Sequence, residues 1–388
     1  MRNLSLLQRV RPYFAVFDLP LALIILLLLS VGLITLYSAG LAIPGKVTDQ
    51  LRNIAAAFVV MWLAANTPPQ MLMRLAAPVY AVAVLLLVAV ALFGTIKGGS
   101  RRWITIGVQI QPSEFMKIAM PLMLAWYFQL QAGRLRWHSY AAAALLLIVP
   151  VLLIARQPDL GTALLVVAAG GCVIYLAGLA WKALAALVVI GCAALPVLWT
   201  FLHDYQRERV YTLLDPYHDP LGQGFHIIQS MIAIGAGGAG GKGWTHGTQA
   251  HLEFIPERTT DFIFAVFSEE FGLLGNVVLM VLYLLLIWRC MNISLGAPTF
   301  FTRLLAGAIT MIYFTYAFVN MGMVSGIVPV VGVPLPFMSY GGTALLTLGL
   351  GAGILMSIQH YGRTVRHGGS GGNGSTAGVG MPARGVSA

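Results

Sequence analysis

Long apolar runs recur along nearly the whole chain, and they constrain its fold more than any other feature. A run of about 18 or more mostly apolar residues is long enough for a helix to cross a bilayer. Only 9% of the 388 residues are charged and 59% are hydrophobic. A soluble fold cannot bury that much apolar surface, because an ordinary soluble domain is roughly 25% charged. The sequence therefore predicts an all-α polytopic membrane protein.

The runs predict about ten transmembrane helices, with a large extracytoplasmic loop between the seventh and the eighth. The expected spans are 19–40, 51–66, 72–94, 113–131, 139–155, 160–178, 182–202, 263–288, 303–325 and 338–360. The first run is too long for a signal peptide and has no evident cleavage site. Three parts are expected: a cytoplasmic N-terminus (1–18), a transmembrane domain (19–362) with its loop at 203–262, and a disordered cytoplasmic tail (363–388) rich in Gly and Ser.

The distribution of charges predicts the orientation of these helices. If the N-terminus is cytoplasmic, twelve Lys and Arg residues lie inside with one acid, Asp18. The remaining 11 of the 23 basic residues lie outside with the remaining 12 of the 13 acids. Four of those outer basic residues lie in the long loop and two within helices, so short loops favour cytoplasmic termini. The net charge of +10 is thus a topology signal rather than a sign of nucleic-acid binding, and the clustered outer acids place the chemistry on the non-cytoplasmic face.

Asp261 stands out because it ends the long loop, immediately before the apolar run 262–267. Thr259 or Thr260 could cap the helix that begins here, and an acid near its first turn would suit the helix dipole. Alternatively, a carboxylate in a partly dehydrated site has a raised pKa, which suits a general base. Position alone leaves both interpretations open.

Several other ionisable residues fall at or within the outer ends of apolar runs, where a charge usually needs a partner or a purpose. Glu114 and Lys117 are three residues apart on one helix face, so they either neutralise each other or form part of a site. Asp159 could cap the next helix or bind substrate. At least one of Glu269 and Glu270 should face the helix bundle. Guanidinium groups suited to phosphate are expected from Arg52, Arg101, Arg102 and Arg207.

The glycine run 235–243 does not match the phosphate-binding loop G-x-x-x-x-G-K-[ST], because Ala236 replaces its first glycine and Gly243 its Ser or Thr. It is either a turn that permits close backbone packing or a backbone cradle for a lipid pyrophosphate. His226 and His246 lack the spacing of a metal-binding motif.

Long ordered motifs resemble the SEDS family (shape, elongation, division and sporulation), whose members polymerise peptidoglycan. They include GGSRRW (98–103), QPSEFMKIA (111–119), RQPDLGTA (156–163), LEFIPERTTDFIFAVFSEEFG (252–272) and FVNMGMVSGIVPVVGVPLPFMSYGG (318–342). Thr248 and Leu252 stand where division members tend to carry Ser and Lys, so the chain is more similar to elongation members. The likeness covers the chain from the first to the tenth expected span.

The resemblance implies a glycosyltransferase that polymerises lipid II during cell elongation and rod-shape maintenance, outside the inner membrane. It makes Asp261 the essential aspartate and general base, and it matches Glu114, Lys117 and, over a shorter stretch, Arg52 to family residues. It implies metal-assisted catalysis by a divalent cation such as Mg or Mn and no organic cofactor. The implied partners are the nascent glycan strand, a class B penicillin-binding protein, other membrane proteins of the elongation complex and membrane lipids.

Two other functions are compatible with ten helices and intramembrane charges. A transporter could flip lipid II, although its charges should then reach both leaflets, whereas the acids here are almost confined to the outer side. A noncatalytic scaffold for the penicillin-binding protein would not need Asp261.

Overall fold

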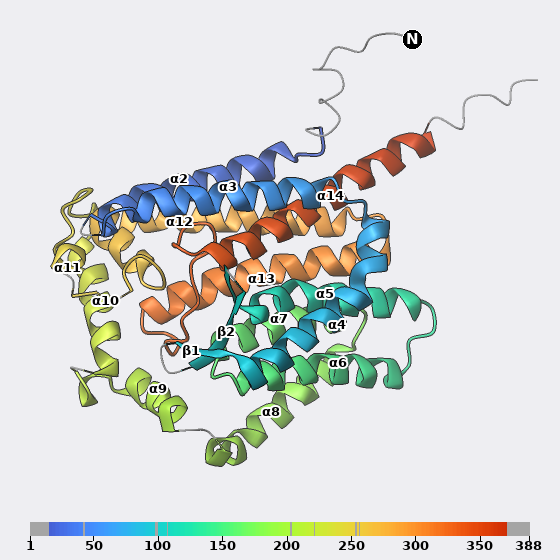
Figure 1. Ribbon diagram of the computed structural model, residues 1–388, viewed down its shortest axis with the longest axis horizontal. Helices are drawn as coiled ribbons and strands as arrows, with labels where there is room; N and C mark the ends of the chain where they lie inside the picture. Colours follow the sequence, from blue (N-terminus) through green and yellow to red (C-terminus); the bar gives the residue numbers. More distant parts are fainter. Residues whose placement is uncertain are drawn as a thin grey trace, which may run out of the picture.

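The computed structural model is mainly helical (Figure 1) and describes residues 15–41, 43–97, 100–106, 108–201, 204–220, 222–252, 254–255 and 257–370. Most of the expected N-terminal segment 1–18 and most of the expected tail 363–388 lie outside these residues. One part of the tail prediction is wrong, because helix α14 continues to Ser370. The Gly- and Ser-rich composition begins only at Gly368, and Arg363 is anchored by an ion pair with Asp18 at 3.2 Å.

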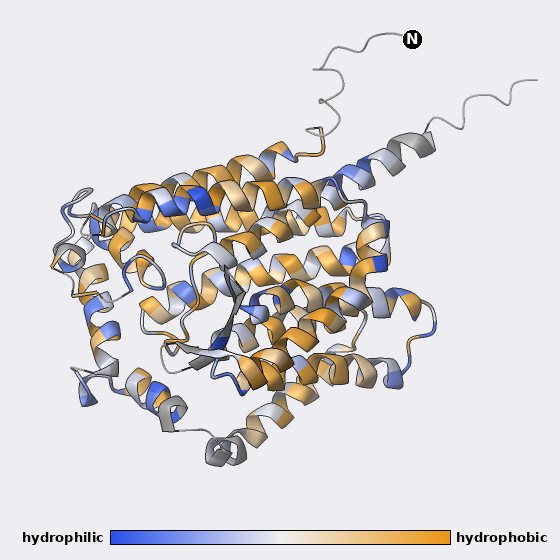
Figure 2. Cartoon of the chain, viewed as in Figure 1, coloured by the Kyte–Doolittle hydropathy of each residue, from blue (hydrophilic) through white to orange (hydrophobic). Residues whose placement is uncertain are grey.

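A long helix lies at each of the ten expected positions. These are α2 (Leu19–Ala39), α3 (Lys46–Ala65), α4 (Pro69–Phe93), α5 (Pro112–Leu130), α6 (Trp137–Ala155), α7 (Leu160–Leu176), α8 (Trp181–Phe201), α12 (Ile263–Leu295), α13 (Phe300–Val324) and α14 (Gly342–Ser370). Within the described residues, six helices are long and apolar enough to cross a membrane, namely α2, α4, α6, α12, α13 and the 342–364 part of α14. Apolar residues run along the bundle helices in Figure 2, and hydrophilic ones gather at helix ends and in the connecting segments.

The segment between α8 and α12 is folded, as predicted. It contains α9 (Asp204–Leu214), the short 3-10 helix η1 (Pro216–His218), α10 (Gln223–Gly237) and α11 (Thr248–His251). These elements line one end of the bundle in Figure 1, and α10 packs against α12. The amphipathic stretch expected around 225–234 is the body of α10.

A small antiparallel sheet, which the sequence analysis did not predict, joins α4 to α5. Its strands are β1 (Thr95–Lys97), β2 (Ser100–Ile106) and β3 (Val108–Ile110), in the order β1-β2-β3. The segment is rich in Ile, Thr and Val and punctuated by glycine, which is the composition of short strands and tight turns. That signal was present, but the apolar runs on either side dominated the interpretation. The sheet matters because β2 carries Arg101 and Arg102.

The glycine run packs against a kink in α12 at Gly272, whose φ is +65°. Four backbone hydrogen bonds join the two: Lys242 N to Glu269 O (3.0 Å), Gly243 N to Glu270 O (3.0 Å), Leu273 N to Gly238 O (2.9 Å) and Leu274 N to Ala239 O (3.1 Å). The run thus replaces helical hydrogen bonds lost at the kink. The close-packing interpretation is confirmed, whereas the pyrophosphate cradle is wrong for Lys242 and Gly243, because α12 carbonyls accept their N–H groups.

The other end of α12 takes part in an ion-pair cluster around Asp18, whose side chain is buried. The Asp18 carboxylate caps α2 by accepting from Leu21 N at 3.2 Å. It also accepts hydrogen bonds from Arg289 of α12, at 2.5 and 2.8 Å, and from Arg363 of α14, at 3.2 Å. The three helix ends that the charge distribution assigns to one side therefore meet in the structure.

Replacing Gly237 by Ala tests the packing at the kink. A Cβ at this position would lie 2.1 Å from the Ser268 carbonyl oxygen, so backbone must move. We expect a loss of about 1–3 kcal/mol in the free energy of unfolding, as for other overpacked sites. Thermal unfolding of the detergent-purified protein measures it. Gly240→Ala is the matched control, because a Cβ there meets nothing within 4 Å; equal stability of the two variants would contradict the packing.

Candidate active site

A polar cavity of about 240 Å³ brings together five of the eight residues that the sequence analysis proposed for the site. They are Arg102, Glu114, Lys117, Asp159 and Asp261. They come from four separate parts of the chain: strand β2, the start of α5, the turn before α7 and the turn before α12. The wall also includes Gly332, Val333 and Tyr340, from the irregular segment 325–341 between α13 and α14. We call this cavity the polar pocket.

Asp261 lies in the turn that precedes α12, and its carboxylate faces the backbone of Gly332. A Cβ added to Gly332 would lie only 3.3 Å from Asp261 Oδ2. The N-cap residue of α12 is Phe262, and no side-chain hydrogen bond caps this helix. The capping interpretation of Asp261, Thr259 and Thr260 is therefore wrong, because the turn brings the Asp261 carboxylate into the wall of the polar pocket.

The surroundings of Asp261 favour its neutral form. Burial raises the pKa of Asp261 to about 6, and the nearby charge of Glu257 adds to the rise. The positive charges of Arg102 and Arg209 oppose it. A carboxylate with a pKa near 6 is ionised at neutral pH and yet basic enough to accept a proton from a hydroxyl in a transition state. The environment thus suits the general-base interpretation.

Glu114 and Lys117 form a buried ion pair on the face of α5 that lines the polar pocket. Lys117 Nζ lies 2.5 Å from Glu114 Oε1. Lys117 also donates to the Tyr316 hydroxyl of α13, which is itself 3.5 Å from Glu114 Oε2. The predicted mutual neutralisation is confirmed. The sequence analysis missed Tyr316, because its distance from α5 along the chain gives no local signal.

Asp159 performs the predicted capping role, since its carboxylate accepts from Thr162 N at the start of α7 at 3.2 Å. It also accepts hydrogen bonds from Gln111 at 2.9 Å and Ser113 at 3.2 Å. Arg102 Nη1 lies 4.0 Å away. This network joins the turn before α7 to the start of α5, so Asp159 is heavily engaged in structure.

Arg102 is held at the pocket by backbone carbonyls. Its guanidinium donates to Gln157 O at 3.2 Å and to Pro158 O. These bonds fasten strand β2 to the turn before α7. The result is a fixed positive charge in the wall of the polar pocket.

The structure does not bring Arg52 and Arg207 into the polar pocket. Arg52 is exposed and pairs with Asp49 at 3.2 Å within α3. Arg207 donates to Trp199 O at 3.1 Å and Thr200 O at 3.0 Å, at the end of α8. Arg101 belongs to β2, but its side chain lies outside what the structure describes. A contact of these three with substrate stays a prediction, whereas Arg209, not singled out from sequence, acts on Asp261 through its charge.

Glu269 and Glu270 are both buried in α12, so the expectation that at least one faces the bundle is confirmed. Glu269 pairs with Lys242 at 2.7 Å and accepts from Thr248 at 3.0 Å. Glu270 accepts a hydrogen bond from Ser38 of α2. These contacts attach the glycine run and α2 to α12 and leave Glu269 and Glu270 outside the polar pocket.

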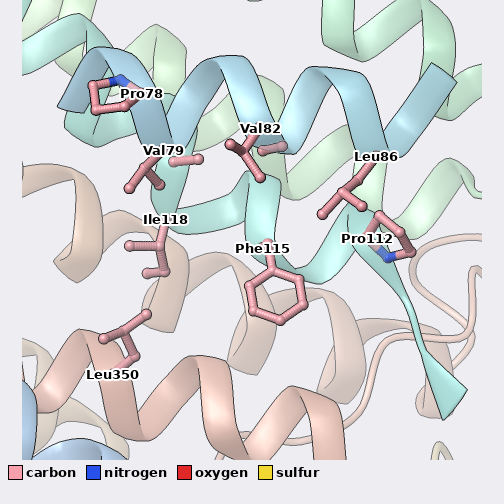
Figure 3. Close-up of a pocket in the computed structure, with 10 residues that line it drawn as sticks. Pro78, Val79, Val82, Leu86, Pro112, Phe115, Ile118 and Leu350 are labelled. Atoms are coloured by element: carbon pink, nitrogen blue, oxygen red, sulfur yellow. The ribbon is translucent and has the colours of Figure 1, made fainter. Parts of the chain in front are cut away.

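An apolar groove of about 400 Å³ lies between α4, α5 and α14 (Figure 3), and α5 lines it with other residues than those that line the polar pocket. Its wall includes Val82 and Leu86 of α4, Phe115 and Ile118 of α5 and Leu350 of α14. A second apolar groove, of about 470 Å³, lies between α2, α3 and α14. Helix α5 thus turns Glu114 and Lys117 to the polar pocket and the neighbouring Phe115 and Ile118 to the first groove. A molecule with a charged head and a hydrocarbon chain matches this division.

Replacing Lys117 by Met tests the buried pair. The single variant leaves Glu114 buried without its cation, so we expect a loss of about 3–5 kcal/mol in the free energy of unfolding. The double variant Glu114→Gln, Lys117→Met removes both charges and should recover most of that loss. Thermal unfolding in detergent measures both. A single variant as stable as the wild type would show that the pair does not hold α5 in place.

Comparisons with known proteins identify the family of the chain. The FtsW, RodA and SpoVE family model, described as cell cycle protein, matches residues 19–364. The peptidoglycan glycosyltransferase MrdB of Escherichia coli (strain K12) is 50% identical over 346 residues, covering 89% of this chain and 94% of that protein. The peptidoglycan glycosyltransferase RodA of Treponema pallidum is 31% identical over 421 residues, covering 88% and 97%.

Solved structures with the same fold include a chain from a peptidoglycan synthase complex that coordinates polymerization and crosslinking. That chain is 35% identical with a TM-score of 0.78, and the match covers 89% of this chain and 98% of that one. The crystal structure of the rod shape determining protein RodA of Thermus thermophilus is 28% identical with a TM-score of 0.68, covering 89% and 97%. Family model, relatives and structures agree: the chain belongs to the FtsW, RodA and SpoVE family of cell cycle proteins.

Proposed function

We propose that this protein is a peptidoglycan glycosyltransferase that polymerises lipid II into glycan strands, with Asp261 as its general base. The observation that carries the proposal is the position of Asp261, in the wall of a polar pocket that also holds Arg102, Lys117, Glu114 and Asp159, with an apolar groove along the same helix α5. Relatives named for this activity align with nearly nine tenths of the chain. The elongation-type motifs of this chain favour a role in elongation and rod shape, and so do the relatives named MrdB and RodA.

The chemistry of the substrate fits the division of the site. Lipid II joins a disaccharide to a polyprenyl chain through a pyrophosphate. Arg102 is the cation of the polar pocket that can face that pyrophosphate, because Lys117 is paired with Glu114. The groove along Val82, Leu86 and Phe115 can take the hydrocarbon chain. Fixed positive charges stabilise the charge that develops on a leaving group, and they do so more strongly in a site that excludes water.

The reaction needs one base and one stabilised leaving group. Asp261 takes the proton from the 4-hydroxyl of the acceptor's GlcNAc as that oxygen forms a bond with C1 of the donor's MurNAc. The bond from C1 to the pyrophosphate oxygen breaks, polyprenyl pyrophosphate leaves with the electron pair, and the configuration inverts to a β-1,4 linkage. A single displacement requires no carboxylate nucleophile, unlike the double displacement of retaining glycosidases.

The same proposal includes ten membrane spans, cytoplasmic termini and a site on the periplasmic side of the inner membrane. Asp261 precedes the first turn of α12, whereas Arg289, which binds Asp18, lies near the last turns. The polar pocket and the Asp18 cluster therefore belong to opposite ends of that helix. The excess of Lys and Arg in short loops assigns the Asp18 end to the cytoplasm.

A divalent cation and a transpeptidase partner remain part of the proposal. Within the described residues, no group of three or more His, Cys, Asp or Glu side chains could hold a metal ion by itself. Mg²⁺ ordinarily uses one or two carboxylates together with substrate phosphates, and Asp159, in the wall of the polar pocket, could supply one. Such an ion would neutralise charge on the pyrophosphate.

A class B penicillin-binding protein is the proposed partner, because the similar structure comes from a complex that couples polymerization with crosslinking.

Replacing Asp261 by Asn tests the proposal and separates it from the transporter and scaffold alternatives. The amide keeps the size of the side chain but cannot accept the proton, so synthesis of glycan from fluorescent lipid II should be abolished. The purified complex with its transpeptidase partner is used. Asp215→Asn is the matched control, because Asp215 caps η1 in the outer segment and Asn caps equally well. Wild-type turnover by Asp261→Asn would remove Asp261 from the base role.

The dependence of activity on pH provides a second test. Only the ionised Asp261 can accept a proton, so kcat/KM should fall about tenfold per pH unit below pH 6. Glu257→Gln removes a charge that raises the pKa of Asp261. The acidic limb should therefore move to lower pH in this variant and stay in place in Asp215→Asn. An unchanged limb in Glu257→Gln would mean that another group sets it.

A further inference from the structure

Two irregular segments form the wall around Asp261. One is the turn 257–262 before α12, and the other is the segment 325–341 between α13 and α14, where Gly332 has a φ of +70°. Irregular backbone at a membrane helix bundle is tolerated where other protein groups satisfy its polar atoms. The position of the Asp261 carboxylate thus depends on what holds these two segments together.

Asn320 of α13 lies between the two segments and is fully buried. Its side-chain nitrogen donates one hydrogen bond to the Asp261 carbonyl oxygen at 2.8 Å and another to the Val333 carbonyl oxygen at 2.7 Å. Only the nitrogen of an amide can donate. The opposite orientation would place Asn320 Oδ1 against two carbonyl oxygens, so the chemistry fixes which way the amide faces.

The two carbonyls belong to the two sides of the same contact. Asp261 supplies the carboxylate, and Gly332, which precedes Val333, supplies the backbone that the carboxylate faces. A hydrogen bond to the Asp261 carbonyl fixes the main chain from which the carboxylate extends. The second bond fixes the facing wall. The Asn320 amide therefore fixes both the main chain of Asp261 and the Gly332–Val333 backbone that the Asp261 carboxylate faces.

A second connection between the segments runs through their backbones, because Tyr340 N donates to Thr259 O at 2.9 Å. This bond joins the far end of segment 325–341 to the residue two positions before Asp261. It does not involve residues 332 and 333. The Asn320 side chain joins this part of the wall to Asp261.

We infer that Asn320 is a positioning residue, which holds the Asp261 main chain and the Gly332–Val333 backbone so that the carboxylate meets the acceptor hydroxyl. This inference rests on the proposed role of Asp261 as the base. Asn320 itself does not line the polar pocket, so it acts through Asp261 and the backbone of Val333. Reacting groups displaced by about 1 Å can lose roughly 100-fold in rate, which makes the turnover number the sensitive quantity.

The test compares Asn320→Leu with Tyr283→Phe in the purified complex, with lipid II polymerisation as the assay. Leu has the same branched shape and the same number of side-chain heavy atoms, although it is larger, and it has no donor. Tyr283→Phe is the matched control, because the Tyr283 hydroxyl donates to Pro336 O at 2.7 Å in the same segment, away from Asp261. We expect kcat in Asn320→Leu to fall about 10- to 100-fold with KM for lipid II changed by less than about threefold. Tyr283→Phe should keep kcat within about threefold of the wild type.

Two outcomes would overturn the positioning role. One is a wild-type kcat in folded Asn320→Leu, and the other is an equal loss of kcat in both variants, which would indicate general loosening of segment 325–341. If Asn320→Leu does not fold, Asn320→Asp decides in its place, because a carboxyl group can donate at most one hydrogen bond to the two carbonyls. Asp261→Asn is assayed alongside. If Asp261→Asn retains turnover, Asp261 is not the base. If Asp261→Asn loses turnover while Asn320→Leu keeps it, only the positioning role of Asn320 is excluded.

Discussion

Polar groups in this protein must find their partners within the protein, because hydrocarbon offers none. The kink of α12 illustrates the requirement, since the glycine run 235–243 supplies hydrogen bonds that the helix loses at Gly272. Charged side chains obey the same rule: Glu269 is matched by Lys242, Glu114 by Lys117, and Asp18 by Arg289. The arrangement of the bundle depends on these internal matches, which connect segments far apart in the chain.

Asp261 differs from the other acids of the polar pocket in how it is used. Glu114 is engaged by Lys117 and Tyr316, and Asp159 by the start of α7 and by Gln111. Asp261, in contrast, is held through its main-chain carbonyl, and the charges that act on its carboxylate come from Glu257, Arg102 and Arg209. Glu114 and Asp159 are thus held through their carboxylates, whereas Asp261 is held through its backbone. This difference suits the proposed role of Asp261, because its carboxylate would have to change its protonation.

The sequence predicted the features that depend on local patterns. All ten long helices fall at the positions given by apolar runs, and Asp261 and Asp159 precede their helices as expected. The roles of Tyr316 and Asn320 could not be predicted, because they result from α13 packing against segments some 60 to 200 residues away in sequence. The choice between a helix cap and a pocket carboxylate for Asp261 also needed the fold, since it depends on which way a turn directs one side chain. The motif resemblance pointed to Asp261 as the essential aspartate without knowledge of the fold, but it gave no physical reason for where its carboxylate lies.

The Asp18 cluster has a mechanical consequence for the whole bundle. It fastens α2, α12 and α14 to one another at one end, through one carboxylate and two guanidinium groups. At the opposite end, Ser38 of α2 donates to Glu270 of α12, and Arg258 donates to the Ala39 carbonyl oxygen at 2.8 Å. Helices joined at both ends cannot pivot or slide past each other without breaking one of these contacts. Helices α2 and α12 should therefore move as one unit when the bundle changes shape.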